Sequence, residues 1–116
     1  MVEECIFCKI VEGKVPAQIV YNDDNFIGIF DVKPKAEGHS LIISKKHFRN
    51  LLDMPSSLGN EMIDGIKAVS LKLIKEGKAE GFNIIFNTEP AAGQAVFHVH
   101  CHIIPRKTGD GLKGIV

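Results

Sequence analysis

The longest periodic segment of the chain alternates apolar and polar positions at helical spacing. Between Ser56 and Lys75 the apolar positions recur every three or four residues, at Leu58, Met62, Ile66, Val69 and Leu73. A stripe with this spacing predicts one amphipathic helix packed on a core. The candidate N-caps are Asp53, Ser56 and Ser57. The residues that suit its C-terminal end are Lys72, Lys75 and Gly77.

Five short β-rich segments surround this helix in the sequence. They are Gln18–Tyr21, Phe26–Phe30, His39–Ser44, Phe82–Asn87 and Val96–Ile104. The polar cluster of residues 22–25 predicts a hairpin between the first two, and residues 31–38 read as a loop. Residues 5–12 predict a short helix that Gly13 would end. Five strands, with the long helix between the third and fourth, predict an α+β fold with a mainly antiparallel five-stranded sheet.

The composition indicates a single small domain without a bulk charge. The chain has 116 residues, and its 14 basic and 14 acidic residues cancel. A neutral protein lacks the long-range positive field that attracts polymeric nucleic acid or an anionic membrane, so any phosphate chemistry has to come from a local site. We therefore expect residues 1–116 to form one domain that takes a small ligand.

No segment of the chain predicts export or membrane insertion. The acidic residues Glu3 and Glu4 stand where a signal peptide would be basic, and no apolar run approaches the ~18 residues of a membrane span. Three cysteines, two of them in the pair Cys5-x-x-Cys8, fit a reducing compartment and metal binding better than a disulfide framework. We expect a cytoplasmic protein.

Three of the five histidines alternate along the last predicted strand. Because side chains alternate between the faces of a strand, His98, His100 and His102 share one face, and Cys101 points to the core. The outer two would lie about 13 Å apart, too far to join the third around one zinc ion at bonds of about 2.1 Å. Three interpretations stay open: histidines without a role, a metal site, and nucleophilic attack of an imidazole on phosphorus with a neighbouring proton donor.

The segment before the histidines has the composition of an anion-binding turn. Gly93 would let backbone N–H groups approach an anion, and Gln94 would add a side-chain donor. By themselves the two residues also describe an ordinary turn. Beside a row of imidazoles they favour phosphoryl or nucleotidyl transfer, in which positioning and charge stabilisation carry much of the chemistry.

Three sequence blocks cover nearly the whole chain in order. They are CIFCKIVEGKVPAQIVYNDD, FDVKPKAEGHSLIISKKH and FNIIFNTEPAAGQAVFHVHCHIIPR. The most specific part is the His-x-His-x-His string of residues 98–102 behind Gly93-Gln94. Together the blocks resemble the histidine triad (HIT) family of nucleotide hydrolases and transferases. The resemblance implies a homodimer whose two sheets join into one, and a site for a purine nucleotide.

The resemblance also implies a role for each histidine of the cluster. His100 is similar to the family nucleophile, which forms a nucleotidyl-histidine intermediate at the α-phosphate. His102 is similar to the residue beside the bridging atom that aids the leaving group, and His98 and His39 match the supporting histidines. The implied substrates are a phosphoramidate, a dinucleoside polyphosphate or an adenylylated species. We expect no catalytic metal, because Asp and Glu are absent from the histidine strand.

Further positions match the family's contacts to the nucleotide. The phosphate contacts match Asn87, Gly93, Gln94, Ala95 and Val96. The ribose contact matches Asp31, and the base contacts match Ile6, Phe7, Ile10 and Ile29. Each has a plainer alternative: Asp31 could cap a turn, Asn87 could satisfy loop backbone, His39 could be structural, and the four apolar residues could belong to the core.

The cysteine pair resembles that of prokaryotic family members in which two cysteines and two histidines hold zinc. The matching ligands are Cys5, Cys8, His47 and His98. A Cys₂His₂ tetrahedron is closed, so this zinc would brace the N-terminal segment rather than activate water. The alternative is a pair of core cysteines. If His98 holds zinc, catalysis falls to His100 and His102.

Two features depart from the best-studied branch of the family. Ala95 stands where that branch has a hydroxyl residue, which removes a hydrogen bond worth roughly 0.5–1.5 kcal/mol near the leaving atom. Residues 109–116 lack the aromatic residue common in the phosphoramidate-cleaving branch. Leaving-group preference is therefore open. Two other functions also stay open: a nucleotide-binding adaptor with little turnover, and a zinc enzyme with histidine ligands.

Overall fold

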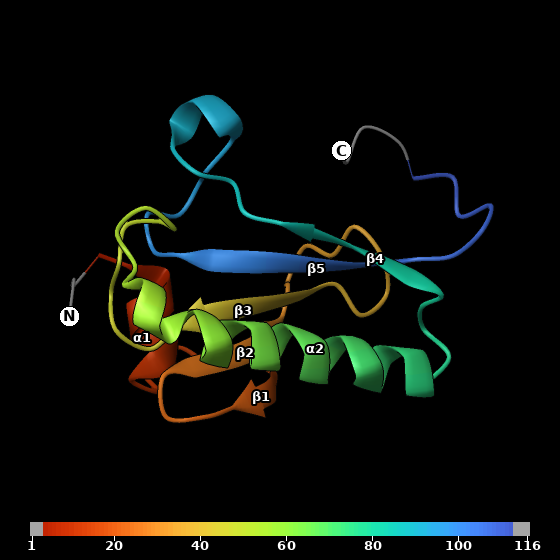
Figure 1. The fold of residues 1–116 in the computed structure, drawn as a ribbon, viewed down its shortest axis with the longest axis horizontal. Helices are drawn as coiled ribbons and strands as arrows, with labels where there is room; N and C mark the ends of the chain where they lie inside the picture. The colour runs from red at the N-terminus through yellow and green to blue at the C-terminus, as the bar shows by residue number, and fades with distance from the viewer. Residues whose placement is uncertain (1–3, 113–116) are drawn as a thin grey trace.

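A five-stranded antiparallel sheet with a helix on each face makes up residues 4–112, the part of the chain that the computed structural model describes (Figure 1). In chain order the elements are α1 (Ile6–Val11), β1 (Ile19–Asn22), β2 (Phe26–Phe30), β3 (Ser40–Ser44), the 3₁₀ turn η1 (Ser56–Leu58), α2 (Gly59–Lys75), β4 (Gly81–Ile85), the 3₁₀ turn η2 (Pro90–Ala92) and β5 (His100–Arg106). The strand order is β1-β2-β3-β5-β4. The predicted α+β fold is confirmed. Of residues 109–116, the segment without an aromatic residue, residues 113–116 lie outside the described part of the chain.

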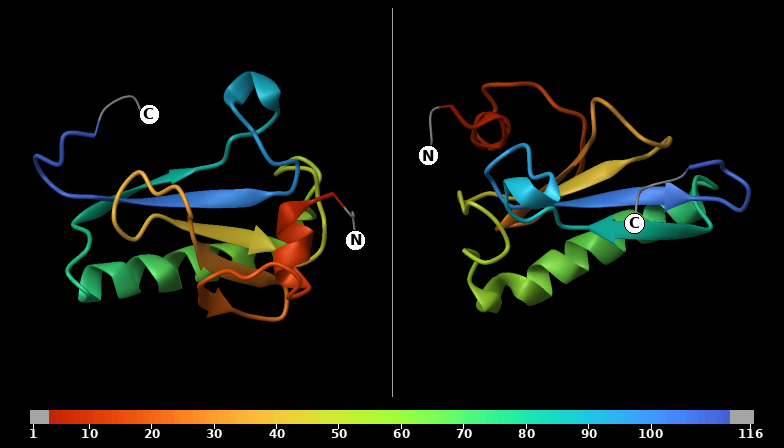
Figure 2. Two further views of the ribbon diagram at one scale, coloured as in Figure 1. Left: turned by 180° about the vertical axis from the view of Figure 1, so that it is seen from behind. Right: turned by 90° about the horizontal axis from the view of Figure 1, so that it is seen from above.

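The two faces of the sheet carry separate apolar clusters, because side chains alternate along each strand. The apolar stripe of α2 packs on the first face, where buried residues are Phe26, Ile42, Met62, Val69, Leu73, Ala79, Val99, Cys101 and Ile103. The second face lies under α1, where buried residues are Cys5, Phe7, Cys8, Ile27, Ile29, Leu41 and Ile43. Figure 2 shows α1 and α2 on opposite sides of the sheet.

The pairing of β3 with β5 determines which face the histidines occupy. Ile43 lies opposite His100 and Leu41 lies opposite His102 in the ladder. Both partners belong to the α1 side, whereas Cys101 packs under α2 with no exposed surface. The predicted alternation, histidines on one face and Cys101 in the core, is confirmed.

The structure refines two predicted starts, that of the last strand and that of the long helix. β5 begins at His100 instead of Val96: its ladder with β3 ends at His100, and the Val99 N–H bonds the Phe48 carbonyl at 2.7 Å. The helix predicted from Ser56 begins as a 3₁₀ turn, and α2 itself begins at Gly59 without a side-chain cap. The carboxylate of Asp53 accepts the Arg49 N–H at 3.1 Å instead.

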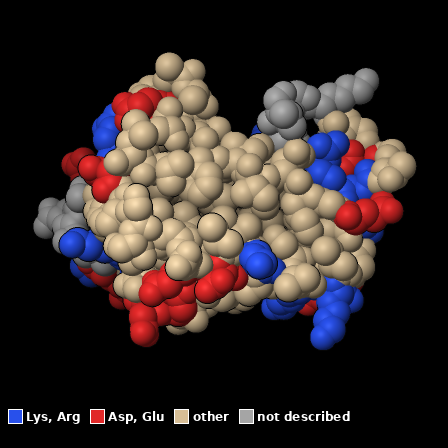
Figure 3. Space-filling model, in the orientation of Figure 1, with Lys and Arg blue, Asp and Glu red and all other residues tan. Residues whose placement is uncertain are grey.

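Charge is segregated along α2 rather than gathered into one field. The helix has Glu61 in its first turn and Lys72 and Lys75 in its last. On the face drawn in Figure 3, acidic and basic side chains occur at both ends of the molecule, with a large uncharged area between them. Within residues 4–112, no helix combines the length and apolarity that crossing a bilayer would require.

The homodimer expected from the resemblance stays a prediction, and the sheet offers two edges for it, β1 and β4. Ile84 on β4 is 43% exposed, and it pairs with Ile103 on the α2 side of the sheet. We expect the β4 edge to join the second copy. A charged side chain in that joint would be costly, so Ile84→Lys should convert a dimer into a monomer in sedimentation velocity.

Ile19 on the opposite edge provides the matched control, since it is 54% exposed on β1. The Ile19→Lys protein should sediment like the wild type. A monomeric wild type would contradict the dimer, and dissociation by Ile19→Lys alone would place the joint at β1.

Candidate functional site

The three alternating histidines belong to three different groups of neighbours. His98 meets Cys5, Cys8 and His47, whereas His102 meets His39 with Nε2 of His39 at 3.0 Å from Nδ1 of His102. His100 lies between, its ring centre 5.1 Å from that of His102. The row therefore does not converge on one point, as the spacing along a strand predicted.

The first group has the donor set and the distances of a tetrahedral metal centre. Nδ1 of His98 lies 3.2 Å from Sγ of Cys5 and 3.1 Å from Nδ1 of His47, and Sγ of Cys8 lies 3.3 Å from Nδ1 of His47. All four ligand atoms lie within 4.8 Å of one another. Zinc bonds of about 2.1 Å to nitrogen and 2.3 Å to sulfur give tetrahedron edges of roughly 3.3–3.8 Å, so a small expansion would seat zinc.

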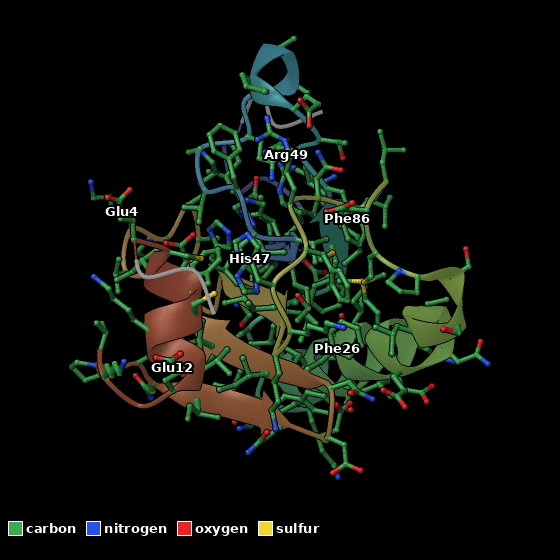
Figure 4. The ribbon with its side chains drawn as sticks, turned by 90° about the vertical axis from the view of Figure 1, so that its left-hand side faces the viewer. Glu4, Glu12, Phe26, His47, Arg49 and Phe86 are labelled. Atoms are coloured by element: carbon green, nitrogen blue, oxygen red, sulfur yellow. The ribbon has the colours of Figure 1, made fainter. Side chains whose placement is uncertain are left out.

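Three separate segments deliver these ligands. Cys5 is the N-cap of α1 and its Sγ accepts the Cys8 N–H at 3.4 Å, so one helical turn aims both sulfurs to the same side. His47 follows β3, and His98 precedes β5. Figure 4 shows His47 beside α1. Because α1 has six residues and is too short to be stable by itself, a bound metal would fasten it to the sheet.

The backbone selects the tautomer of His98 that a metal requires. Its Nε2 lies 2.7 Å from the carbonyl of Ser44, which can only accept, so Nε2 carries the proton and Nδ1 offers its lone pair to the cluster. A ligating histidine ordinarily donates its other N–H in this way. Burial lowers the pKa of His98 to about 4, so the ring is neutral at physiological pH. The predicted ligands Cys5, Cys8, His47 and His98 are thus brought together.

The second group, Asp31, His39 and His102, resembles a metal site in composition but not in tautomer. The Lys35 N–H donates to Nδ1 of His39 at 3.1 Å, so the proton of the neutral His39 ring sits on Nε2. That Nε2–H points at Nδ1 of His102, with Oδ2 of Asp31 at 3.5 Å. The proton on Nε2 of His39 thus lies where a metal ion would have to sit. Because Nδ1 of His102 accepts this proton in a hydrogen bond, the neutral His102 ring carries its own proton on Nε2.

His100 has the opposite tautomer. Its Nδ1 lies 2.7 Å from the carbonyl of His98, which fixes the proton on Nδ1 and leaves the Nε2 lone pair available. Within residues 4–112 this Nε2 has no hydrogen-bond partner, and it is not sealed from solvent. The edge of Phe7 packs on the ring at 4.9 Å between centres. Burial lowers the pKa of His100 below its ordinary value, which favours the neutral ring.

The loop before His98 differs in one respect from the prediction. Gly93 has φ +87° as expected of the glycine, but its N–H bonds the Pro90 carbonyl at 2.9 Å. The buried Gln94 amide accepts the Glu89 N–H and donates to the carbonyls of Arg49 and Val96. The Gly93 N–H and the Gln94 side-chain amide are therefore already occupied by hydrogen bonds within the protein, and they are not free to bind an anion.

The main-chain N–H groups of the two residues after Gln94 are still available to bind an anion. The N–H groups of Ala95 and Val96 make no hydrogen bond within residues 4–112. Both residues border a hollow of about 380 Å³, whose other lining residues are Glu4, Cys5, Ile6, His47 and Phe97. The main-chain N–H groups at positions 95 and 96 are therefore available to a ligand.

The remaining predicted contacts surround the histidines unevenly. Oδ1 of Asp31 caps the following turn through the Lys33 N–H at 2.9 Å, while its Oδ2 faces His39. Ile6 is 40% exposed, whereas Phe7 and Ile29 are buried and Ile10 is half-buried. Asn87 is half-buried just beyond β4. Of the four apolar residues, Ile6 is thus the most open to a ligand.

Sequence reasoning missed the groups that orient the histidines. The Ser44 carbonyl, the Lys35 N–H and the His98 carbonyl each fix one ring, and all three are backbone atoms. Their residue types are irrelevant to this role, so the sequence holds no signal for them. The ion pair of Arg49 and Glu89 was not predicted either, because its two residues stand 40 positions apart in the sequence.

The chain thus has a row of oriented imidazoles, preceded in the sequence by main-chain N–H groups that could bind an anion. Comparison with known proteins identifies the family: the HIT domain matches residues 12–109, and the chain belongs to the HIT family. The predicted membership is confirmed.

Three similar proteins bear on the site. The chain is 41% identical to adenylylsulfatase HINT3 of Arabidopsis thaliana over 94% of its length, although it spans only 55% of that protein. A HIT family hydrolase from Clostridium thermocellum is 38% identical, covers all of both chains and has a TM-score of 0.83. A zinc-bound histidine triad family protein from Mycobacterium smegmatis is 42% identical, with a TM-score of 0.80 over 94% of this chain and 79% of that one.

We predict that the protein carries about one zinc ion per chain, held by the closed Cys₂His₂ set. Cys8→Ser should lower the zinc content and the melting temperature, because a hard hydroxyl replaces a thiolate ligand. Metal analysis by inductively coupled plasma mass spectrometry measures this. Cys101→Ser is the control: it changes a buried cysteine outside the cluster and should keep the zinc. A wild type without metal after growth in zinc would contradict the assignment.

Acid should destabilise the protein through His102. Burial, with His100 and His39 adding to it, lowers the pKa of His102 to about 4. The unfolded chain, with an ordinary pKa near 6.5, binds the proton first, so the free energy of unfolding falls as pH drops from about 6.5 to 4. His102→Asn should flatten this slope by at most about 1.4 kcal/mol per pH unit, measured by urea denaturation across that range. An unchanged slope would contradict a half-buried His102 ring that stays neutral in the folded protein.

Proposed function

We propose that the protein is a nucleotide hydrolase or nucleotidyl transferase that acts at the α-phosphate of a purine nucleotide conjugate. His100 is the nucleophile and His102 assists the leaving group. The observation that carries the proposal is the opposed tautomers of the two rings: an unprotonated Nε2 on His100 and a protonated Nε2 on His102, on one strand face. One ring is ready to attack and its neighbour to donate a hydrogen bond.

In the first step Nε2 of His100 attacks the α-phosphorus. The bond from Nε2 to phosphorus forms, the bond from phosphorus to the bridging atom breaks, and the bonding pair leaves with that atom. The positive charge that develops on the imidazole is stabilised through its Nδ1–H, which already donates to the His98 carbonyl at 2.7 Å. Nε2–H of His102 donates to the bridging atom and stabilises the charge that grows there.

In the second step water attacks the phosphorus and releases the nucleoside monophosphate. The bond from oxygen to phosphorus forms, the bond from phosphorus to Nε2 breaks, and His100 returns to its neutral form. The proton lost by water goes to the departed group or to solvent. Two displacements of moderate barrier replace one difficult displacement, which is the general advantage of a covalent intermediate.

The nucleotide is held by groups on both sides of the histidines. The N–H groups of Ala95 and Val96 bind the α-phosphate oxygens, with Gly93 and Gln94 shaping their turn, and Asn87 lies beside that turn. Asp31 binds the ribose hydroxyls, and Ile6, Phe7, Ile10 and Ile29 form the base side. Zinc, when bound by Cys5, Cys8, His47 and His98, supplies structural bracing and no open coordination position.

The names of two similar proteins support the substrate class. One is an adenylylsulfatase and another a HIT family hydrolase. A sulfate leaving group departs as an anion and needs hydrogen bonds more than a proton, which suits a neutral His102. The candidate substrates are adenylyl sulfate, dinucleoside polyphosphates and adenosine phosphoramidates.

The test is turnover of these three conjugates by wild type, His100→Ala and His102→Ala. Loss of the nucleophile should lower kcat by about 10⁴-fold or more, and loss of the leaving-group donor by about 10²–10³-fold. Intact-mass spectrometry of the wild type, quenched during turnover, should detect one added nucleotidyl group that the His100→Ala protein lacks.

Glu76→Ala serves as the control, since Glu76 pairs with Lys78 beyond the C-terminal end of α2 and lies outside the site. Its turnover should equal that of the wild type. Nucleotide binding without turnover in the wild type would refute the enzyme and favour the adaptor. Equal activity of His100→Ala and wild type would refute the nucleophile.

A further inference from the structure

Glu89 holds a backbone conformation that residues other than glycine rarely adopt. Its φ is +74° and its ψ is 157°, and within residues 4–112 no other residue except glycine has positive φ. A side chain persists in this region only where its surroundings over-determine it, and such residues cluster at functional sites. Glu89 introduces the turn that precedes the main-chain donors Ala95 and Val96.

The carboxylate of Glu89 accepts hydrogen bonds from Arg49 and Asn50, which follow the candidate metal ligand His47 in the chain. Arg49 donates two hydrogen bonds to it, from Nε to Oε2 at 3.0 Å and from Nη2 to Oε1 at 3.1 Å. The buried Asn50 also donates its side-chain N–H to Oε2. The guanidinium lies 4.4 Å from the ring centre of Phe97. A bidentate pair of this kind fixes orientation. Figure 4 shows Arg49 between His47 and η2.

The backbone of Glu89 also makes hydrogen bonds, and these connect it to Gln94 and through Gln94 back to Arg49. Its N–H donates to Oε1 of Gln94 at 2.8 Å, and its carbonyl accepts the N–H groups of Ala92 and Gln94. Gln94 in turn donates from Nε2 to the Arg49 carbonyl at 2.7 Å. Glu89, Arg49 and Gln94 therefore form a closed circuit, which fastens the loop of residues 87–96 to the segment that begins at His47.

We propose that Glu89 is a positioning residue, which holds the loop of residues 87–96 so that the N–H groups of Ala95 and Val96 meet the α-phosphate. Glycine would adopt the same backbone without strain, but it has no carboxylate to join Arg49 and Asn50. The identity of the ligand rests on the proposed function, whereas the circuit itself does not. This role is distinct from global stability, because an ion pair exposed by 48% and 45% at its two side chains adds little to it.

Glu89→Gly is the decisive variant, since it relieves the backbone and removes the carboxylate together. Hydrogen–deuterium exchange should become faster at residues 87–97, and the Kd for AMP in calorimetry should rise about tenfold. With an adenosine phosphoramidate, KM should rise more than kcat falls, because the loop binds the phosphate and the histidines are untouched. The melting temperature should stay at or above that of the wild type, as strain is lost.

Two further variants control for unrelated effects. Glu89→Gln keeps the length and one acceptor oxygen, so its AMP affinity should stay within about threefold of the wild type. Glu76→Ala removes another exposed ion pair, with Lys78 at 3.6 Å, from a residue in ordinary conformation, and exchange at residues 87–97 should be unchanged.

Unchanged exchange at residues 87–97 in Glu89→Gly would overturn the proposal, as would a loss of exchange protection spread evenly over the whole protein. The proposed function fails separately. A wild type that turns over no nucleotide conjugate refutes the enzyme, while the exchange rates of Glu89→Gly still decide whether Glu89 fastens the loop.

Discussion

The protonation pattern of the histidine cluster depends on three main-chain groups. The Ser44 carbonyl places the proton of His98 on Nε2, the Lys35 N–H places that of His39 on Nε2, and the His98 carbonyl places that of His100 on Nδ1. A peptide group cannot change from donor to acceptor, so these assignments hold as long as the backbone does. Rings of the same chemical type thereby have different protonation patterns, on which the proposed metal binding, leaving-group assistance and nucleophilic attack depend.

The sheet and the loops contribute different parts of this arrangement. The period of two along β5 and the residues just before it puts the imidazoles in a row on the α1 side, but it does not distinguish one ring from another. The rings differ in their neighbours. The cysteines Cys5 and Cys8 and a loop histidine lie at one end of the row, and the loop of residues 31–39 lies at the other. The face under α2 remains an ordinary apolar core, so the histidine cluster lies on the other side of the sheet, beside the apolar residues under α1.

Features with a local physical cause could be predicted from the sequence, and those that depend on distant partners could not. The apolar period of α2, the turn of residues 22–25 and the histidine alternation each follow from neighbouring residues. The start of β5 depends on where β3 stops pairing, and the partners of Gln94 are Glu89, Arg49 and Val96. The positive φ of Glu89 had no signal at all, because glutamate gives none and its partner Arg49 stands 40 positions away. The candidate metal ligands were predicted through resemblance, since a lone Cys-x-x-Cys is weak evidence.

The third cysteine has a practical consequence for thiol chemistry. Cys101 has no exposed surface, and burial raises the pKa of its thiol to about 12. Alkylating reagents attack the thiolate, and they need access to it. In the native protein Cys101 is therefore silent to such reagents, and any thiol that they label belongs to Cys5 or Cys8.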